Sequence, residues 1–310
     1  MQLRKLGATD LDIAPLVLGG NVFGWTADRD TSFAILDAFL EAGFNAIDTA
    51  DVYSRFAQGM VGGESENIIG EWMEDRGVRD RIVVITKGGL PMGEGMQGLG
   101  DAYLSSACEA SLRRLRTDHI DVYMAHRADP GVAIEQTLET FQRLIDAGKV
   151  RFAGCSNYTA DELEAALAAA GDGRARYQVL EPHYNLAHRG EYEGALENLC
   201  TANGLGVVPY FALASGFLTG KYRRPEDARG LRGSMAKNYI NPDGMRLLDA
   251  MGAVAERHGA THSQVAIAWL MARPSVTAPI ASATSLAQLS DILKSAELRL
   301  DPEDLAELEG

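Results

Sequence analysis

Short apolar segments alternate with helix-like segments along most of the chain, and this alternation constrains the fold more than any single motif. Eight segments have the character of buried strands: residues 15–19, 44–48, 82–86, 120–125, 150–155, 177–181, 206–210 and 277–281. Helical patterns lie at about residues 31–42, 64–75, 101–115, 132–147, 160–170, 191–203 and 244–258, with two more near 262–272 and 286–294. Strands that return through helices pair in parallel, so this order predicts a closed (β/α)₈ barrel.

An open, doubly wound sheet is the alternative architecture. Such a sheet normally carries Gly-x-Gly-x-x-Gly after its first strand, at the start of a helix. The chain has Gly-Gly-Asn-Val-Phe-Gly at residues 19–24, and no helical pattern follows it directly. Residues 3–13 add an N-terminal β-hairpin with its turn at residues 7–10. We therefore expect one barrel domain that spans residues 1–310.

Two connections are longer than the usual two to six residues. One covers residues 88–100, with six glycines in thirteen residues, and the other covers residues 212–243. Both follow the C-terminal end of a strand candidate. They are therefore expected to be long loops that cover the same mouth of the barrel as lids.

Ionisable side chains stand at the ends of three successive strand candidates. Asp48, Lys87 and His126 are 39 residues apart, and Tyr53 follows five residues after the first of them. In a barrel, side chains at these strand ends converge on one mouth, where catalytic groups lie. An acid, a phenol, an amine and an imidazole are together the parts of a proton-transfer site.

Each of these residues also has an ordinary interpretation when it is taken singly. Asp48 could cap a turn, and His126 could be a core histidine with satisfied hydrogen bonds. Lys87 could be a surface lysine, or it could form a Schiff base as lysines of barrel aldolases do.

The sequence around these residues resembles the aldo-keto reductases. The matching segments are residues 48–53 (Asp-Thr-Ala-Asp-Val-Tyr), 85–87 (Ile-Thr-Lys), 124–127 (Met-Ala-His-Arg), 154–157 (Gly-Cys-Ser-Asn), 207–222 and 279–284. Gly-Glu-Ser-Glu at 63–66 is more similar to the bacterial and potassium-channel-β-like branches than to the aldose reductase branch. The resemblance implies a barrel enzyme that reduces an aldehyde or ketone to an alcohol, reversibly, with NADP(H) or NAD(H).

Carbonyl reduction needs a hydride on carbon and a proton on oxygen. A tyrosine with a pKa near 10 is a weak acid at neutral pH, but a nearby ammonium group lowers that pKa. A carboxylate beside the lysine keeps the lysine charged. We therefore expect Tyr53 to donate the proton, Lys87 to lower the pKa of the phenol and Asp48 to pair with Lys87. His126 would orient and polarise the carbonyl group, and the resemblance implies the same roles.

The resemblance also implies cofactor contacts. Ser156 and Asn157 match the pair that holds the nicotinamide carboxamide, and Tyr210 matches the aromatic residue that stacks on the nicotinamide ring. The helix near 286–294 would offer its N-terminus to a phosphate. The other implied cofactor contacts are Gly20, Asn21, Val22, Asp48, Glu181, Phe211, Leu213, Gly216, Leu218, Lys221, Ser282, Thr284, Gln288 and Asp291.

The chain departs from the family pattern at several of these positions. Glu181 stands where related sequences usually carry glutamine, and Thr284 stands where an arginine usually grips the 2′-phosphate of NADP. Loss of that arginine removes a charge-assisted hydrogen-bonding fork. NADP(H) remains the preferred cofactor on family grounds, and NAD(H) is the alternative. Lys221, Arg223 or Arg232 could supply another cation.

The substrate is expected to be a small carbonyl compound or alcohol that contacts Trp25, Tyr53 and His126. Aromatic residues and methionines near the mouth favour an apolar or ring-containing substrate. The net charge is −14 and no basic block occurs, so nucleic acid and anionic membranes are poor partners. We expect a cytoplasmic protein, since no signal core or run of 18 apolar residues occurs. The protein is expected to be a monomer or a homo-oligomer.

Cysteine usage argues against a metal site and a disulfide framework. The three cysteines are Cys108, Cys155 and Cys200, which are far apart in the chain. Two other functions remain open. One is a redox-sensing subunit that binds nicotinamide cofactor and turns over slowly, as channel β-subunits do. The other is a Schiff-base enzyme that uses Lys87, against which the Ser156-Asn157 pair and the Tyr210 segment count.

Overall fold

Eight parallel strands form the centre of the protein in the computed structural model, which describes residues 1–310 apart from the side chains of Leu231 and Arg232. The strands are β3 (Val17–Gly19), β4 (Ala46–Asp48), β5 (Val83–Gly88), β6 (Ile120–Ala125), β7 (Val150–Ser156), β8 (Tyr177–Glu181), β9 (Gly206–Val207) and β10 (Ile280–Ala281). Neighbours follow chain order, and β10 pairs with β3. The amide of Ile280 donates to the carbonyl oxygen of Pro209 at 2.8 Å, which joins the last strands and closes the sheet. The predicted barrel is confirmed.

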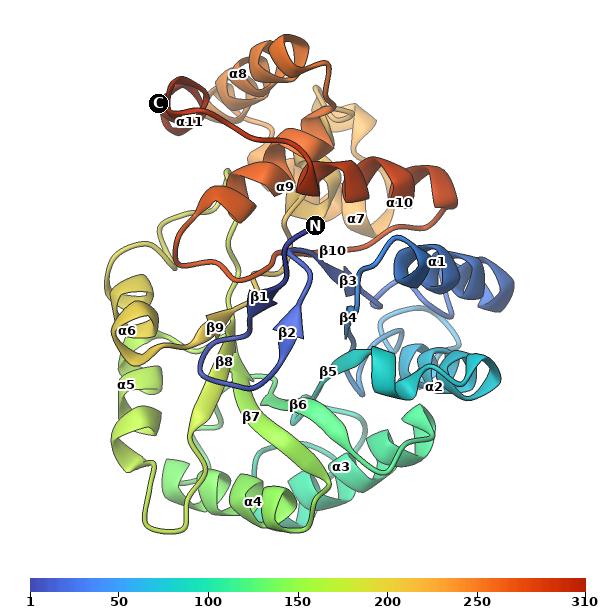
Figure 1. The fold of residues 1–310 in the computed structure, drawn as a ribbon, viewed down its shortest axis with the longest axis vertical. Helices are drawn as coiled ribbons and strands as arrows, with labels where there is room; N and C mark the ends of the chain where they lie inside the picture. Colours follow the sequence, from blue (N-terminus) through green and yellow to red (C-terminus); the bar gives the residue numbers. More distant parts are fainter.

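Helices surround the strands on the outside (Figure 1). The predicted helices are present as α1 (Arg29–Glu41), α2 (Glu64–Arg76), α3 (Asp101–Leu115), α4 (Ile134–Asp146), α5 (Ala160–Ala169), α6 (Ala195–Asn203), α8 (Pro242–His258), α9 (His262–Ala272) and α10 (Leu286–Leu293). The structure adds α7 (Gly230–Ala236) and α11 (Pro302–Glu309). No helix in the described part of the chain is both long and apolar enough to cross a membrane.

The N-terminal hairpin, β1 (Arg4–Lys5) and β2 (Asp12–Ile13), lies over one end of the barrel (Figure 1). Its turn presses against the start of β9, because a Cβ atom on Gly7 would lie 2.3 Å from the amide nitrogen of Gly206. Leu6 and Ile13 belong to the same apolar cluster as the inner residues of the strands. The hairpin therefore closes the end opposite the C-terminal strand ends.

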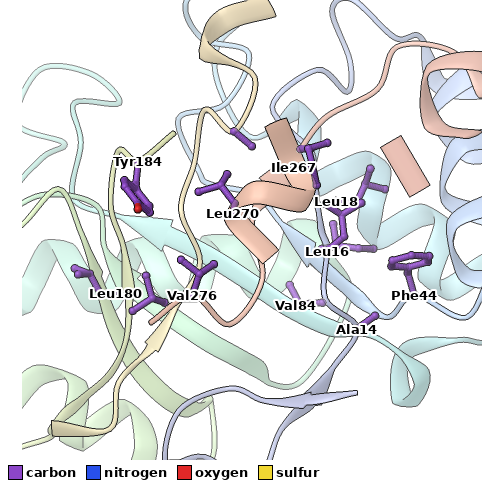
Figure 2. Packing of buried hydrophobic residues seen from close by; sticks show 14 of the residues in the cluster. Ala14, Leu16, Leu18, Phe44, Val84, Leu180, Tyr184, Ile267, Leu270 and Val276 are labelled. Atoms are coloured by element: carbon purple, nitrogen blue, oxygen red, sulfur yellow. The ribbon is translucent and has the colours of Figure 1, made fainter. Parts of the chain in front are cut away.

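Two apolar layers follow from the alternation of side chains along each strand. Ala46, Val83 and Ile85 lie in the inner cluster that fills the barrel. The alternate positions face the helices, so that Leu18 of β3 packs near Ile267 of α9 (Figure 2). Residues that continue the inner series beyond the filled core therefore open onto the mouth.

The long connections differ in part from the prediction. Residues 89–100 are irregular, as expected, but residues 212–241 form a series of short helices rather than an open loop. These are η2 (Ala214–Thr219), η3 (Pro225–Asp227), α7 and η4 (Lys237–Tyr239). The last two strands are also shorter than predicted, since only residues 206–207 and 280–281 pair as ladder strands.

Candidate active site

One inward-facing position at the C-terminal end of each barrel strand points into a common cavity. Counting two residues on from the inner core along each strand gives Gly19, Asp48, Lys87, His126, Ser156, Glu181, Tyr210 and Ser282. All of them except Lys87 line a cavity of about 630 Å³. This is a usual size for a small-molecule or cofactor site.

Lys87 lies just beneath the cavity floor and is fully buried. Its ammonium nitrogen lies 2.5 Å from Oδ1 of Asp48, 2.9 Å from the carbonyl oxygen of Thr49 and 3.1 Å from the hydroxyl oxygen of Tyr53. The Tyr53 hydroxyl donates to Oδ2 of Asp48 at 3.2 Å. An ammonium group has three protons, so these three contacts use all of them.

Glu181 brings a second carboxyl group to the same lysine. Its Oε2 atom lies 3.2 Å from Nζ of Lys87, yet it is buried and makes no well-directed hydrogen bond within the described residues. Burial first, and then the charge of Asp48, raise the pKa of Glu181 well above its usual range. A single ammonium group between two buried carboxyl groups favours one shared proton, with Glu181 as the neutral partner.

Lys87 itself stays charged. Burial acts to lower its pKa, but Asp48, Glu181 and Tyr53 together outweigh that effect and raise the pKa of Lys87 well above its usual value. For Asp48 the largest effect is burial, which raises the pKa of that carboxyl group against the opposing effect of Lys87.

The pKa of Tyr53 differs from the prediction. We expected Lys87 to bring it below 10, but it lies well above 10 in this structure. Burial has the largest effect, Asp48 adds to it, and Lys87 opposes both. Lys87 acts in the predicted direction, but the predicted net pKa is wrong because the prediction took no account of burial or of the charges of Asp48 and Glu181. Tyr53 therefore carries its proton at neutral pH and can donate it.

His126 lies next to this cluster as a neutral imidazole. Its ring centre is 6.2 Å from that of Tyr53, and burial, followed by the charge of Lys87, holds its pKa well below the usual 6.5. Its Nδ1 atom is buried and has no hydrogen-bond partner among the described residues. A neutral imidazole carries one N–H donor that could meet a carbonyl oxygen.

Polar groups beside His126 form a connected chain. Nδ2 of Asn157 donates to the carbonyl oxygen of His126 at 3.0 Å, and the hydroxyl of Tyr210 donates to Oδ1 of Asn157 at 2.6 Å. The hydroxyl of Ser156 donates to the carbonyl oxygen of Glu181 at 3.0 Å. His183 stacks on the ring of Tyr210 with centres 5.2 Å apart. Sequence reasoning missed His183, although it follows Glu181 by only two residues.

The far end of the cavity is formed by β3, β10 and the start of α10. The hydroxyl of Ser282 donates to Oδ1 of Asn21 at 2.6 Å, and a Cβ atom on Gly19 would lie 2.4 Å from the Ser282 hydroxyl oxygen. Oε1 of Gln288 accepts from both the amide and the hydroxyl of Thr284, at 2.9 and 3.0 Å. Asp291 accepts from Gln264 at 2.7 Å.

Most of the predicted site residues line this cavity, but Lys87 beneath its floor and four others do not. Val22 and Leu218 are buried in the apolar core, and Gly20 is buried behind its neighbours Gly19 and Asn21. The indole of Trp25 donates to the carbonyl oxygen of Asn21 at 2.6 Å and lies outside the cavity lining.

Several cavity residues were not predicted. They are Gly19, Leu90, Arg127, Ala212, Ser215, Thr219, Ser263, Ile280, Ala281 and Ile292. Ser215 is among three non-glycine residues of its segment with positive φ, together with Phe211 and Ala214. Such backbone strain is concentrated at binding sites. Because neither Phe nor Ala signals a positive φ, the sequence could not reveal this turn.

The chain is similar to known proteins over nearly all its length. The sequence pattern of the aldo/keto reductase family matches residues 15–310. The uncharacterized oxidoreductase YrpG of Bacillus subtilis (strain 168) is 34% identical over 98% of this chain and 94% of its own. A probable voltage-gated potassium channel subunit beta of Oryza sativa subsp. japonica is 32% identical over 100% and 96%.

A third relative is named as an aldo-keto reductase. Aldo-keto reductase AFTS1 of Alternaria alternata is 30% identical over 99% of this chain and 90% of its own. The match to the family pattern and to these full-length relatives agrees with the closed barrel and with the ionisable groups at its mouth. This protein is a member of the aldo/keto reductase family.

Proposed function

We propose that this oxidoreductase uses NADP(H), or less favourably NAD(H), to reduce an aldehyde or ketone to an alcohol in a reversible reaction. One catalytic domain spanning residues 1–310 would carry the activity. The observation that carries the proposal is the buried contact of Lys87 with both Asp48 and Tyr53, at 2.5 and 3.1 Å, beneath the cavity that His126 lines.

The residues around the cavity fit a nicotinamide cofactor. The lining continues from Tyr53 past Tyr210 to Thr284 at the start of α10, so one elongated ligand could contact all of it. Gly19 leaves room beside Ser282 that a side chain would fill. Ser156, Asn157 and Glu181 would hold the carboxamide, Tyr210 would stack on the ring, and residues 211–221 with 282–291 would hold the phosphates and adenosine. When bound, the cofactor supplies the hydride.

The protein's own groups account for the proton. Tyr53 transfers its hydroxyl proton to the carbonyl oxygen as the C–O double bond becomes an alcohol, and the phenolate that remains accepts a hydrogen bond from Lys87. Asp48 keeps Lys87 charged and in place. The neutral ring of His126 donates to the carbonyl oxygen and so holds the substrate against Tyr53. The phenol regains its proton from solvent.

A direct experiment is a fluorescence titration with NADPH and NADH, followed by a panel of aldehydes and ketones. The proposal requires saturable cofactor binding and cofactor oxidation that depends on the carbonyl compound. Cofactor binding with no turnover of any carbonyl compound would instead favour the slow redox-sensing subunit. The similarity to a protein named as a probable potassium channel subunit beta supports keeping that second function open.

The Schiff-base alternative is opposed by the surroundings of Lys87. A Schiff base requires a neutral amine that is free to attack a carbonyl carbon. Lys87 has a raised pKa, and its three protons are directed at Asp48, Thr49 and Tyr53. The amine therefore lacks both a free electron pair and an open side.

Thr284→Arg is expected to tighten NADPH binding and to leave NADH binding nearly unchanged. Thr284 carries no charge, so it provides no fork for a 2′-phosphate, whereas a charge-assisted hydrogen bond contributes roughly 1.5–3 kcal/mol. For the wild type we expect measurable NADH activity and an NADPH preference of roughly tenfold to a hundredfold. Both Kd values can be measured by quenching of tryptophan fluorescence at fixed salt.

A wild-type preference for NADPH beyond about a thousandfold would contradict this view of Thr284. Another cation would then hold the phosphate. Lys221 lines the cavity, whereas Arg223 pairs with Asp249 at 2.6 Å. The side chain of Arg232 lies outside the described residues.

Glu181→Gln is expected to stabilise the protein by a margin that grows as pH rises. Because the pKa of Glu181 is raised on folding, the native state binds more protons than the unfolded state above about pH 4.3. Wild-type stability therefore falls as pH rises through that window, by at most about 1.4 kcal/mol per pH unit for one proton. Glutamine keeps the shape and removes the titration.

Urea unfolding of wild type and Glu181→Gln across roughly pH 5 to 8 measures this margin. Glu164→Gln is the matched control, because Glu164 is an exposed glutamate on α5. A difference in unfolding free energy that stays constant with pH would show that Glu181 does not titrate abnormally.

A further inference from the structure

Arg127 is a cation at the cavity mouth without an acidic partner in the described part of the chain. It directly follows His126, lines the cavity and is exposed. None of the described residues forms a hydrogen bond or an ion pair with its guanidinium group. By contrast, the guanidinium group of Arg114 pairs with the carboxylate of Glu66 at 2.6 Å. In a protein with 43 acidic and 29 basic residues, an unpaired arginine beside a cavity needs an explanation.

The backbone on both sides of His126 is held firmly, which fixes where Arg127 begins. The amide of His126 donates to the carbonyl oxygen of Gly88 at 3.0 Å, and its carbonyl oxygen accepts from Asn157 at 3.0 Å. The charge of Arg127 acts to lower the pKa of both His126 and Tyr210. The guanidinium group is therefore within electrostatic reach of the rings on either side of the reaction centre.

The nearest acid in the sequence does not neutralise Arg127. Asp129 accepts from the amide of Leu99 through Oδ2 and from the amide of Gly131 through Oδ1, both at 2.9 Å. Asp129 thus serves to shape the loop. Lys87 lies beneath the cavity floor, and its three protons are already used by Asp48, Thr49 and Tyr53.

We propose that Arg127 forms an anion-binding subsite for the substrate, so that the preferred substrates are aldehydes or ketones that also carry a carboxylate or phosphate group. This inference rests on the proposed carbonyl reduction. A guanidinium fork matches two oxygen atoms of either anion. Leu90 also lines the cavity and provides apolar surface for the carbon skeleton between the anion and the carbonyl group.

Matched substrates test the subsite. We would measure kcat/KM for 4-carboxybenzaldehyde and for 4-carbamoylbenzaldehyde, its neutral amide, and use 4-formylphenyl phosphate to distinguish phosphate from carboxylate. For Arg127→Gln, the ratio of anionic to neutral kcat/KM should fall roughly tenfold to a hundredfold, as expected for loss of a charge-assisted hydrogen bond. Arg127→Lys keeps the charge without the fork and should give an intermediate ratio.

Arg55→Gln is the control for general electrostatics, because Arg55 is exposed on the loop after Tyr53 and does not line the cavity. Its ratio should equal that of wild type. An unchanged ratio in Arg127→Gln would overturn the subsite, and so would a loss confined to NADPH affinity, which would make Arg127 a cofactor contact. Activity on the neutral amide tests the carbonyl reduction by itself, so its absence would contradict the proposed function rather than the role of Arg127 alone.

Discussion

Tyr53→Phe is expected to lower kcat for carbonyl reduction at least roughly 10²-fold while leaving cofactor affinity nearly intact. The hydroxyl is the only group that the substitution removes, and it lies 3.1 Å from Nζ of Lys87 and 3.2 Å from Oδ2 of Asp48. Both contacts point to a proton donor. The mutant kcat and its Kd for NADPH are the quantities to measure.

Tyr103→Phe removes the same hydroxyl from a partly buried tyrosine on α3 that does not line the cavity. Its kcat should remain close to that of wild type. Retention of more than about a tenth of wild-type kcat by Tyr53→Phe would remove Tyr53 as the general acid, because that role contributes roughly 10²-fold or more.

Lys87→Met is expected to reduce kcat by orders of magnitude and also to destabilise the fold. The substitution leaves the phenolate that forms at Tyr53 without its hydrogen bond, and it leaves Asp48 and Glu181 buried without a cation. Removing one partner of a buried ion pair costs about 3–5 kcal/mol. Steady-state rates at several pH values and urea unfolding measure the two effects separately.

The double variant Lys87→Met with Asp48→Asn separates stability from catalysis. The neutral amide should recover part of the lost stability, because no ionised Asp48 remains unpaired, whereas activity should stay low. A rate for Lys87→Met equal to that of wild type near pH 7 would rule out Lys87 as the partner of Tyr53.

The architecture was accessible from sequence because buried strands and amphipathic helices have different periods. A period of two places Asp48 and Glu181 on the same inner face as Ala46 and Val179, and the barrel closes these positions around one mouth. The equal spacing of Asp48, Lys87 and His126 reflects two successive strand-helix repeats of equal length, from β4 to β5 and from β5 to β6. The convergence of these side chains could therefore be predicted before any coordinates.

Other features depend on three-dimensional packing. The raised pKa of Tyr53 results from burial and nearby carboxyl groups, and Glu181 meets Lys87 from a strand more than 90 residues away in the chain. Leu218 turns into the core whereas Gly216 lines the cavity, because Ser215 and Gly216 have non-helical dihedral angles that redirect the chain before Leu218.

Two parallel measurements test carbonyl reduction most directly. One follows oxidation of the cofactor, and the other searches for a covalent adduct on Lys87. The protein would be incubated with NADPH and an aldehyde, with alcohol formation followed alongside absorbance, and a parallel sample would be treated with borohydride and analysed by peptide mass. We expect one NADPH to be oxidised for each alcohol formed, over many turnovers, and Lys87 to remain unmodified. A reduced Schiff base on Lys87, or bound NADPH that is not oxidised by any carbonyl compound, would contradict the assignment.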